Sequence, residues 1–133
     1  MSSNKIIIIT APSGAGKTSI VRYLLKKYPQ KLDFSISATT RKAREGEVNE
    51  KDYYFIGEDL FKTKIHNNEF VEWEMVYEGK YYGTLQSEIE RIWAEGKTPV
   101  LDIDVKGALR IQERYPECSL SIFIQPPSVK ELK

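Results

Sequence analysis

The sequence predicts an α/β fold: a parallel core sheet lies between helices, and a small mixed subdomain is inserted into the chain. Three observations indicate this fold. Apolar runs near both ends of the chain are typical of strands buried on both faces of a parallel sheet. Segments with apolar residues at helical spacing follow these runs. Between about Ser35 and Gly83, the pattern is instead that of antiparallel strands.

The N-terminal quarter contains a strand, a helix and a second short strand. Four consecutive isoleucines predict a buried strand over residues 5–10. After a loop over 11–16, apolar residues recur at helical spacing and predict a helix that ends near Tyr28, just before Pro29. Residues 32–37 are then a candidate for a short strand.

The middle of the chain predicts the inserted subdomain. Residues 41–52 are charged and form a loop, 53–56 form a strand, and apolar positions from 60 to 65 indicate a short helix. Residues 70–77 alternate between apolar and acidic side chains, which is typical of a half-buried antiparallel strand. The face expected to be buried carries Val71, Trp73, Met75 and Tyr77.

The C-terminal part returns to strand–helix alternation. A helix follows Leu85 and ends at Gly96, and an apolar strand covers 98–104. A second helix ends at Pro116, and a last strand covers 120–124. Ser128 and Glu131 form a capping box, so we expect a helix to begin where the sequence stops and the chain to be a fragment of a longer protein.

Composition limits the possible functions. The chain has 133 residues and a formal net charge of +1, so no overall field favours nucleic acid or an anionic membrane. The single cysteine, Cys118, and the single histidine, His66, exclude an internal disulfide and a Cys/His zinc site. No apolar run approaches the roughly 20 residues of a membrane helix. We expect a soluble cytoplasmic protein with no membrane or nucleic-acid partner.

Residues 11–18 read A-P-S-G-A-G-K-T and lie between a predicted buried strand and a helix. This is the context of a P-loop, although Ala11 replaces the first glycine of the pattern. We predict that Lys17 reaches the β- and γ-phosphates of ATP and that Thr18 binds Mg²⁺. The alternative is a glycine-rich turn with a capping threonine. The predicted ATP phosphate-binding residues are Ser13, Gly14, Ala15, Gly16, Lys17 and Thr18.

Two aspartates end the apolar strand over 98–104, at the edge where open α/β sheets bind ligands. Asp102 is our candidate to support Mg²⁺, as the second acidic strand of P-loop enzymes does. The alternative is an ordinary turn in which Asp104 caps the next helix. The motif and these strands predict a P-loop NTPase fold with three α/β/α layers.

Five further motifs occur in an order and spacing that resemble those of guanylate kinases. They are S-A-T-T-R-K-A-R-E-G-E from Ser37, D-Y-Y-F from Asp52, F-V-E-W from Phe70, Y-Y-G-T from Tyr81 and L-D-I-D from Leu101. The resemblance covers residues 5–133. It implies a P-loop core over 1–34 and 86–133 and a GMP-binding subdomain over 35–85, with the lid and the final strand and helix of the family absent.

The resemblance also implies a GMP site. Arg41, Arg44, Tyr53 and Tyr82 would hold the GMP phosphate, because guanidinium groups present donor forks that match phosphate oxygens. Glu72 and Ser37 would read the guanine edge, with Thr84 and Asp104 assisting. A carboxylate accepts the paired N–H donors of guanine but faces a bare acceptor on adenine. Without the resemblance, Glu72 would be read as part of a solvent face and the arginines as solvated loop residues.

The implied reaction is the transfer of the γ-phosphoryl group of ATP to GMP, giving ADP and GDP, with Mg²⁺ as cofactor. Lys17, Arg41 and Arg44 would be the catalytic residues. Because the lid arginines of the family lie beyond Lys133, we expect this chain to turn over poorly or not at all. The sequence does not decide between a monomer and a homodimer as the oligomeric state. The alternatives are a guanylate-kinase-like module that binds phosphopeptides, which keeps the fold but typically loses the P-loop, and a P-loop kinase with another acceptor.

Overall fold

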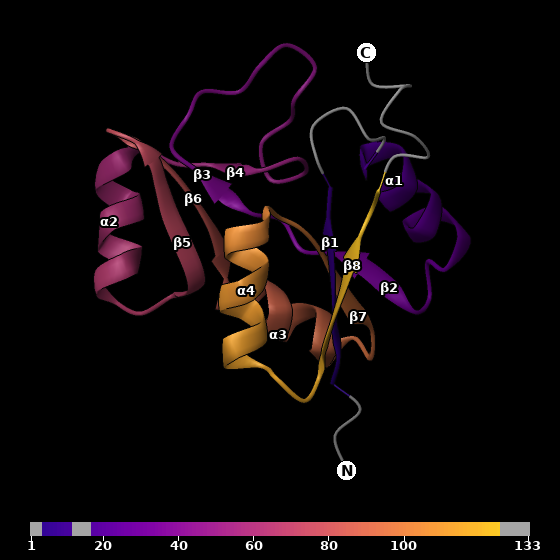
Figure 1. Cartoon of the computed structure of the whole chain (residues 1–133). Coiled ribbons are helices and arrows are strands. Elements are labelled where there is room, and N and C mark those ends of the chain that lie inside the picture. The colour runs from indigo at the N-terminus through magenta and orange to yellow at the C-terminus, as the bar shows by residue number, and fades with distance from the viewer. Residues whose placement is uncertain (1–3, 12–16, 126–133) are drawn as a thin grey trace. The chain divides into compact units, whose positions relative to one another are not determined.

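A computed structural model of the chain describes residues 4–11 and 17–125 (Figure 1). The chain divides into two compact units. The first unit comprises Met1–Phe34 and Gly96–Lys133, and the second is Ser35–Glu95. The helix expected from residue 128 onward lies outside the described residues.

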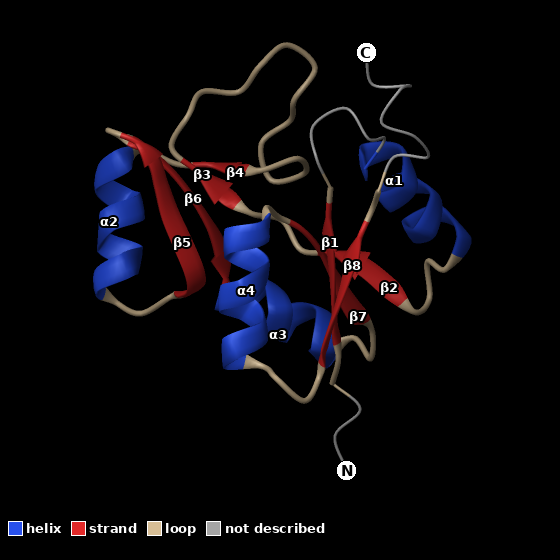
Figure 2. Cartoon of the chain, in the orientation of Figure 1, coloured by secondary structure: helices blue, strands red, loops and turns tan. Residues whose placement is uncertain are grey.

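The first unit is built on a four-stranded parallel sheet in the order β2-β7-β1-β8 (Figure 2). In the two central strands Ile7 lies opposite Val100 and Ile9 opposite Asp102. The elements of this unit are β1 (Ile6–Thr10), α1 (Lys17–Lys27), β2 (Leu32–Phe34), β7 (Thr98–Asp102), α4 (Val105–Arg114) and β8 (Ser119–Phe123). The parallel sheet and its helices confirm the predicted α/β fold class.

The order of the strands places the two helices on opposite faces of this sheet. From β1 the chain crosses through α1 to β2, and from β7 it crosses through α4 to β8, in the opposite direction. Because parallel crossovers are right-handed, opposite directions require opposite faces, and Figure 1 shows α1 and α4 on the two sides of the sheet. The carboxyl ends of β1 and β7 therefore form a topological switch point, where open α/β sheets bind ligands.

The isoleucine run of β1 is buried, as its composition predicted. Ile6, Ile8 and Ile9 are at most 1% exposed, and Val100 of the neighbouring strand is fully buried. Val21 of α1 packs with Ile9 and Val100 in one hydrophobic cluster. A central strand buried on both faces explains why the sequence shows a continuous apolar run here and no alternation.

The second unit contains a mixed sheet in the order β4-β3-β6-β5. Strand β3 pairs in parallel with β4 and antiparallel with β6, and β6 pairs antiparallel with β5. This agrees with the antiparallel character expected for the insert. The elements are β3 (Ala38–Thr39), β4 (Tyr54–Phe55), α2 (Glu58–His66), β5 (Phe70–Tyr77), β6 (Lys80–Leu85) and α3 (Gln86–Ala94).

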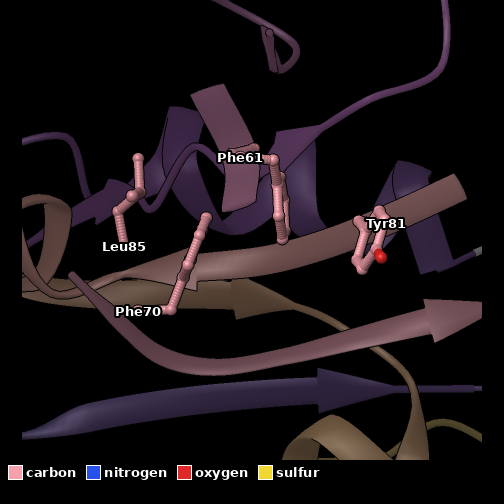
Figure 3. Close-up of a cluster of buried hydrophobic side chains, with 5 residues drawn as sticks. Phe61, Phe70, Tyr81 and Leu85 are labelled. Atoms are coloured by element: carbon pink, nitrogen blue, oxygen red, sulfur yellow. The ribbon is translucent and has the colours of Figure 1, made fainter. Parts of the chain in front are cut away.

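An aromatic cluster forms the core of this unit (Figure 3). Phe61 of α2 is fully buried and stacks on Phe70 of β5, with ring centroids 4.4 Å apart. Tyr81 of β6 lies 5.1 Å from Phe61 on the same side, and Leu85 and Ala38 complete the cluster. Helix α2 is thus fixed to the sheet through Phe61, and its Ile65 also packs against the cluster.

Three features of the second unit differ from the sequence-based expectations. Strands β3 and β6 were not predicted, because β3 is only two residues long and Gly83 interrupts the apolar pattern of β6. Helix α3 belongs to the second unit and not to the first, since its Glu88 accepts hydrogen bonds from Ile36 N and the Tyr54 hydroxyl.

The burial predicted for β5 holds only at its start. Val71 is buried, but Trp73, Met75 and Tyr77 are 39%, 49% and 67% exposed. Strand β5 is at the edge of the sheet, and its register against β6 shifts between Phe70 and Glu72 and again between Met75 and Tyr77. These irregularities break the strict two-residue alternation on which the prediction depended.

Candidate functional site

Two threonine hydroxyls fix the segment that leads into Arg41. Thr39 Oγ1 donates to the carbonyl of Tyr81 at 3.0 Å and accepts from Arg41 N at 3.3 Å. Thr40 Oγ1 donates to the carbonyl of Gly79 at 2.8 Å and accepts from Tyr81 N at 2.9 Å. The short strand β3 is thereby held to β6 by side chains as well as by its backbone, and Arg41 leaves the sheet from a defined position.

The guanidinium group of Arg41 makes four directed hydrogen bonds. Nε donates to the Tyr82 hydroxyl at 3.0 Å, and Nη1 donates to the carbonyl of Lys42 at 3.0 Å. Nη1 and Nη2 also donate to the two carboxylate oxygens of Glu47, at 2.7 and 2.8 Å. The side chain of Arg41 is only 12% exposed. A bidentate pair of this kind fixes the plane of the guanidinium group.

Aromatic rings line the same guanidinium group. Its central carbon lies 5.0 Å from the ring centroid of Tyr53 and 5.7 Å from that of Phe55. Tyr53 also meets Tyr82 edge-on, with centroids 6.1 Å apart. The rings attract the cation through their π faces. Three of the four residues predicted to hold phosphate, Arg41, Tyr53 and Tyr82, therefore lie together.

The fourth of these residues, Arg44, is connected through Glu47. Its side chain is exposed, but its backbone N donates to Glu47 Oε1 at 2.7 Å, and its carbonyl accepts from Glu47 N at 3.0 Å. The hydrogen bond from Arg41, with that from the Arg44 backbone, lowers the pKa of Glu47 to about 2. The same pairing raises the pKa of Arg41 above its usual range. Glu47 is thus charged and holds both arginine-bearing segments.

The second predicted subsite is a buried carboxylate–hydroxyl pair. Glu72 on β5 is 8% exposed, and Thr84 on β6 is fully buried. Thr84 Oγ1 donates to Glu72 Oε2 at 2.8 Å, and the two residues lie opposite each other in the strand register. The reading of Glu72 as a solvent-face residue is therefore wrong. The β5–β6 pairing brings together the residue predicted to read the base and its predicted assistant.

Ser37 lies directly before β3 and is half-buried. Its carbonyl accepts from Tyr54 N at 2.9 Å. The residue before it, Ile36, donates its N–H to Glu88 Oε1 at 2.9 Å, and the hydroxyl of Tyr54 donates to Glu88 Oε2 at 2.9 Å. Burial and the hydrogen bond to Glu88 raise the pKa of Tyr54 to about 12.

Sequence reasoning assigned no role to Glu47 or Glu88. Glu47 belongs to the motif that begins at Ser37, but nothing in the local pattern indicated that its carboxylate pairs with the guanidinium group of Arg41, six residues earlier. For Glu88 the sequence carries only the i,i+3 spacing to Arg91, whose Nη2 lies 3.1 Å from Glu88 Oε1. That spacing is common on exposed helix faces, so it did not indicate a buried site.

The predicted phosphate-binding residues of the first unit are only partly described. Residues 13–16 and the side chain of Lys17 lie outside the description. The backbone of Lys17 begins α1, and Thr18 is exposed in its first turn. Helix and strand therefore flank the motif as a P-loop requires.

Asp102 and Asp104 occupy different positions in the first unit. Asp102 is the last residue of β7 and lies beside Ile9, at the carboxyl ends of the central strands. Asp104 lies beyond the strand, which ends two residues earlier than predicted. It caps α4 by accepting from Gly107 N at 2.8 Å, which is the alternative role considered for it.

Within residues 4–11 and 17–125, no three His, Cys, Asp or Glu side chains converge as a metal-binding group. In the same part of the chain, every helix is too short or too polar to cross a membrane.

Comparison with known proteins identifies the family of the chain. The sequence model of the guanylate kinase family matches residues 3–133. The chain is 50% identical over 129 residues to the guanylate kinase of Porphyromonas gingivalis, a match that covers 97% of this chain and 69% of the relative. It is 46% identical over 131 residues to that of Bacteroides thetaiotaomicron, covering 98% and 64%. The chain thus spans about two-thirds of the length of the relatives it matches.

A solved structure shows the same similarity in three dimensions. The crystal structure of guanylate kinase from Anaplasma phagocytophilum superposes with a TM-score of 0.81 at 36% sequence identity. The match covers 98% of this chain and 65% of that structure. With a family match over nearly every residue and relatives close to half identical, the chain belongs to the guanylate kinase family.

Proposed function

We propose that this chain carries the nucleotide-binding sites of a nucleoside monophosphate kinase that transfers the γ-phosphoryl group of ATP to GMP. The second unit would bind GMP, and the first would bind the phosphates of ATP. The observation that carries the proposal is the buried Glu72–Thr84 pair, with its hydrogen bond of 2.8 Å. A charged group so far from water must serve either structure or recognition, because its burial is costly.

The chemistry of this pair favours guanine. A carboxylate accepts several hydrogen bonds, and the hydroxyl of Thr84 supplies one of them. Guanine offers two adjacent donors, N1–H and the 2-amino group, whereas adenine presents an unprotonated N1 at that position. An adenine in this site would leave a buried charge facing an acceptor, which can cost several orders of magnitude in affinity. Ser37 is the proposed second contact to the base.

The proposed phosphate subsite is the group formed by Arg41, Arg44, Tyr53 and Tyr82. Arg41 is already held in one plane by Glu47 and Tyr82, so little side-chain entropy would be lost when it binds a phosphate. During transfer, Arg41 and Arg44 would neutralise charge on the acceptor phosphate. Asp104 caps α4 in the structure. A second role, in which it helps Glu72 and Ser37 to recognise guanine, stays a prediction.

On the ATP side, the proposal assigns the phosphates to residues 13–18, with Lys17 at the β- and γ-phosphates. Mg²⁺ would be held by Thr18 and Asp102. Hydroxyl and carboxylate oxygens suit this ion, and a nucleotide-bound Mg²⁺ needs only one or two protein ligands. The position of Asp102 at the switch point beside Ile9 fits this assignment. When bound, the metal would neutralise charge on the transferring phosphate.

Calorimetric titration of the chain with GMP, and with AMP as the matched control, tests the acceptor. We expect GMP to bind at least about 100-fold more tightly than AMP, because only guanine satisfies Glu72. Circular dichroism would verify that the chain is folded. A folded chain that binds both nucleotides equally, or neither of them, would contradict the proposal.

A further inference from the structure

Glu88 of α3 is a buried carboxylate outside the groups that the proposed function uses. It is 3% exposed. A carboxylate in such a position is stable only if its oxygens are well supplied with donors. The structure supplies four, two on each oxygen.

These donors come from three different segments. Oε1 accepts from the backbone N of Ile36 at 2.9 Å and from Arg91 Nη2 at 3.1 Å. Oε2 accepts from the hydroxyl of Tyr54 at 2.9 Å and from Arg91 Nε at 3.2 Å. Arg91 lies on the same helix and supplies the compensating charge. The other two donors belong to the segment before β3 and to β4, so Glu88 ties both to α3.

Both of those segments are joined directly to Ser37, one through the chain and the other through a backbone hydrogen bond. Ile36 immediately precedes Ser37, and Tyr54 N donates to the Ser37 carbonyl at 2.9 Å. Ser37 is therefore held on its N-terminal side through Ile36 and Glu88, and on its C-terminal side by Tyr54, which itself bonds to Glu88. The neighbouring Ser35 is buried, and its Oγ makes no hydrogen bond within the described part of the chain. The side chain of Ser35 therefore does not help to hold this segment.

We propose that Glu88 is a positioning residue for guanine recognition, acting on the base through Ser37. The inference rests on the proposed function, in which Ser37 contacts the guanine edge. A serine hydroxyl on a short segment discriminates between bases only if the backbone that carries it is fixed, since an error of about 1 Å breaks a hydrogen bond. The anchor of that backbone lies on a helix that makes no proposed contact with GMP.

A double-mutant cycle between Ser37→Ala and Glu88→Gln tests this inference, with GMP affinity measured by calorimetry on the whole chain. Ser37→Ala should weaken GMP binding about tenfold, as expected for one hydrogen bond. Glu88→Gln replaces an acceptor facing Tyr54 and Arg91 by a donor, and should weaken binding by a similar factor. Because both substitutions act through the same contact with the base, the double variant should lose about tenfold in GMP affinity, and not about 100-fold.

Two further variants make the test robust. Tyr54→Phe removes one donor to Glu88 while the ring is kept, and it should also weaken GMP binding. When Ser37 is already replaced by alanine, Tyr54→Phe should cause no further loss of GMP affinity. Glu90→Gln alters another carboxylate of α3 and should leave GMP affinity unchanged. Circular dichroism of each variant would show that it is folded.

The possible outcomes separate the two proposals. Non-additive losses for both the Glu88 and the Tyr54 variants support the positioning role. Additive losses in folded variants that still bind GMP would overturn that role and leave the proposed function intact. A folded wild-type chain that binds no GMP would overturn both.

Discussion

The two ends of the proposed GMP site are built on opposite principles. At the base end, the carboxylate of Glu72 is buried and accepts a hydrogen bond from the hydroxyl of Thr84. At the phosphate end, the cation Arg41 is paired with an anion, Glu47, whose side chain is 22% exposed. In each case the internal partner resembles the ligand. Thr84 donates to Glu72 as guanine would, and Glu47 accepts from Arg41 as a phosphate would.

This difference determines what each end can do when a ligand arrives. A carboxylate has capacity for several donors, so Glu72 can accept from guanine without losing Thr84. A phosphate at Arg41 must share the guanidinium group with Glu47 or replace it, because two of the bonds from Arg41 already go to that carboxylate. On the proposed function, the base end would therefore act as a fixed template, whereas the phosphate end would exchange one anion for another. Three predictions test this contrast.

The largest effect is expected from Glu72→Gln. The substitution keeps the size of the side chain but places an NH₂ donor against the donors of guanine. We expect GMP affinity to fall about 100-fold or more, which corresponds to about 2.7 kcal/mol. The amide oxygen can still accept from Thr84, so loss of this hydrogen bond should not contribute to any change in the free energy of unfolding. Calorimetric titration with GMP and thermal unfolding would measure the two effects.

Glu74→Gln provides the control for this prediction. Glu74 is the next carboxylate along the same strand and lies opposite Tyr82. Its replacement should leave the preference for GMP over AMP intact. If Glu72→Gln bound GMP as tightly as the wild-type chain, the base end would not be the template described above.

An intermediate effect, on stability, is expected from Gly83→Ala beside the base end. A Cβ at position 83 would lie 2.7 Å from two ring carbons of Phe70 and 3.2 Å from the carbonyl oxygen of Glu72. Phe70 is stacked on Phe61 and cannot easily move away. We expect the free energy of unfolding to fall by about 1–3 kcal/mol, as for other overpacked cores.

Chemical denaturation of Gly83→Ala and Gly57→Ala would test how tightly this region is packed. Gly57 precedes α2 with a φ of −71°, and a Cβ there would meet no atom within 4 Å. Its replacement should change stability by no more than about 0.5 kcal/mol. Equal stability of the two variants would mean that the base end yields to a methyl group and is not a rigid template.

The parts of the molecule that could be predicted from sequence are those that depend on neighbouring residues in the chain. Local signals sufficed for the first unit: the isoleucine run gave β1, and helical spacing gave α1 and α4. They also allowed a P-loop to be predicted at residues 11–18, because this motif is contiguous in the chain. Arg41, Tyr82, Glu72 and Thr84 are far apart in sequence, and only a resemblance spanning several motifs connected them. Their grouping depends on β6, which local pattern did not reveal.

What sequence could not provide is the identity of the internal partners. Glu47 and Glu88 are ordinary charged residues by composition, and their importance arises from the atoms that the fold places within 3 Å of them. The exposure of Trp73, Met75 and Tyr77 was missed for a related reason, since it follows from register shifts at an edge strand. In both cases tertiary pairing overrides a local pattern.

The smallest effect, and the one that most directly tests the phosphate end, is the acid dependence of the Arg41–Glu47 pair. Pairing lowers the pKa of Glu47 from 4.5 to about 2. Its stabilising contribution is therefore complete above about pH 4.5 and is lost as the pH falls toward 2, where the folded state also becomes protonated. Glu47→Gln should be less stable than the wild-type chain at pH 7, and this difference should shrink between pH 4.5 and pH 2. Urea denaturation across this range would measure it, with the neighbouring Glu45→Gln as control. A stability difference that stays constant down to pH 2 would show that Glu47 is not the anion holding Arg41, and that the phosphate end is not built for exchange.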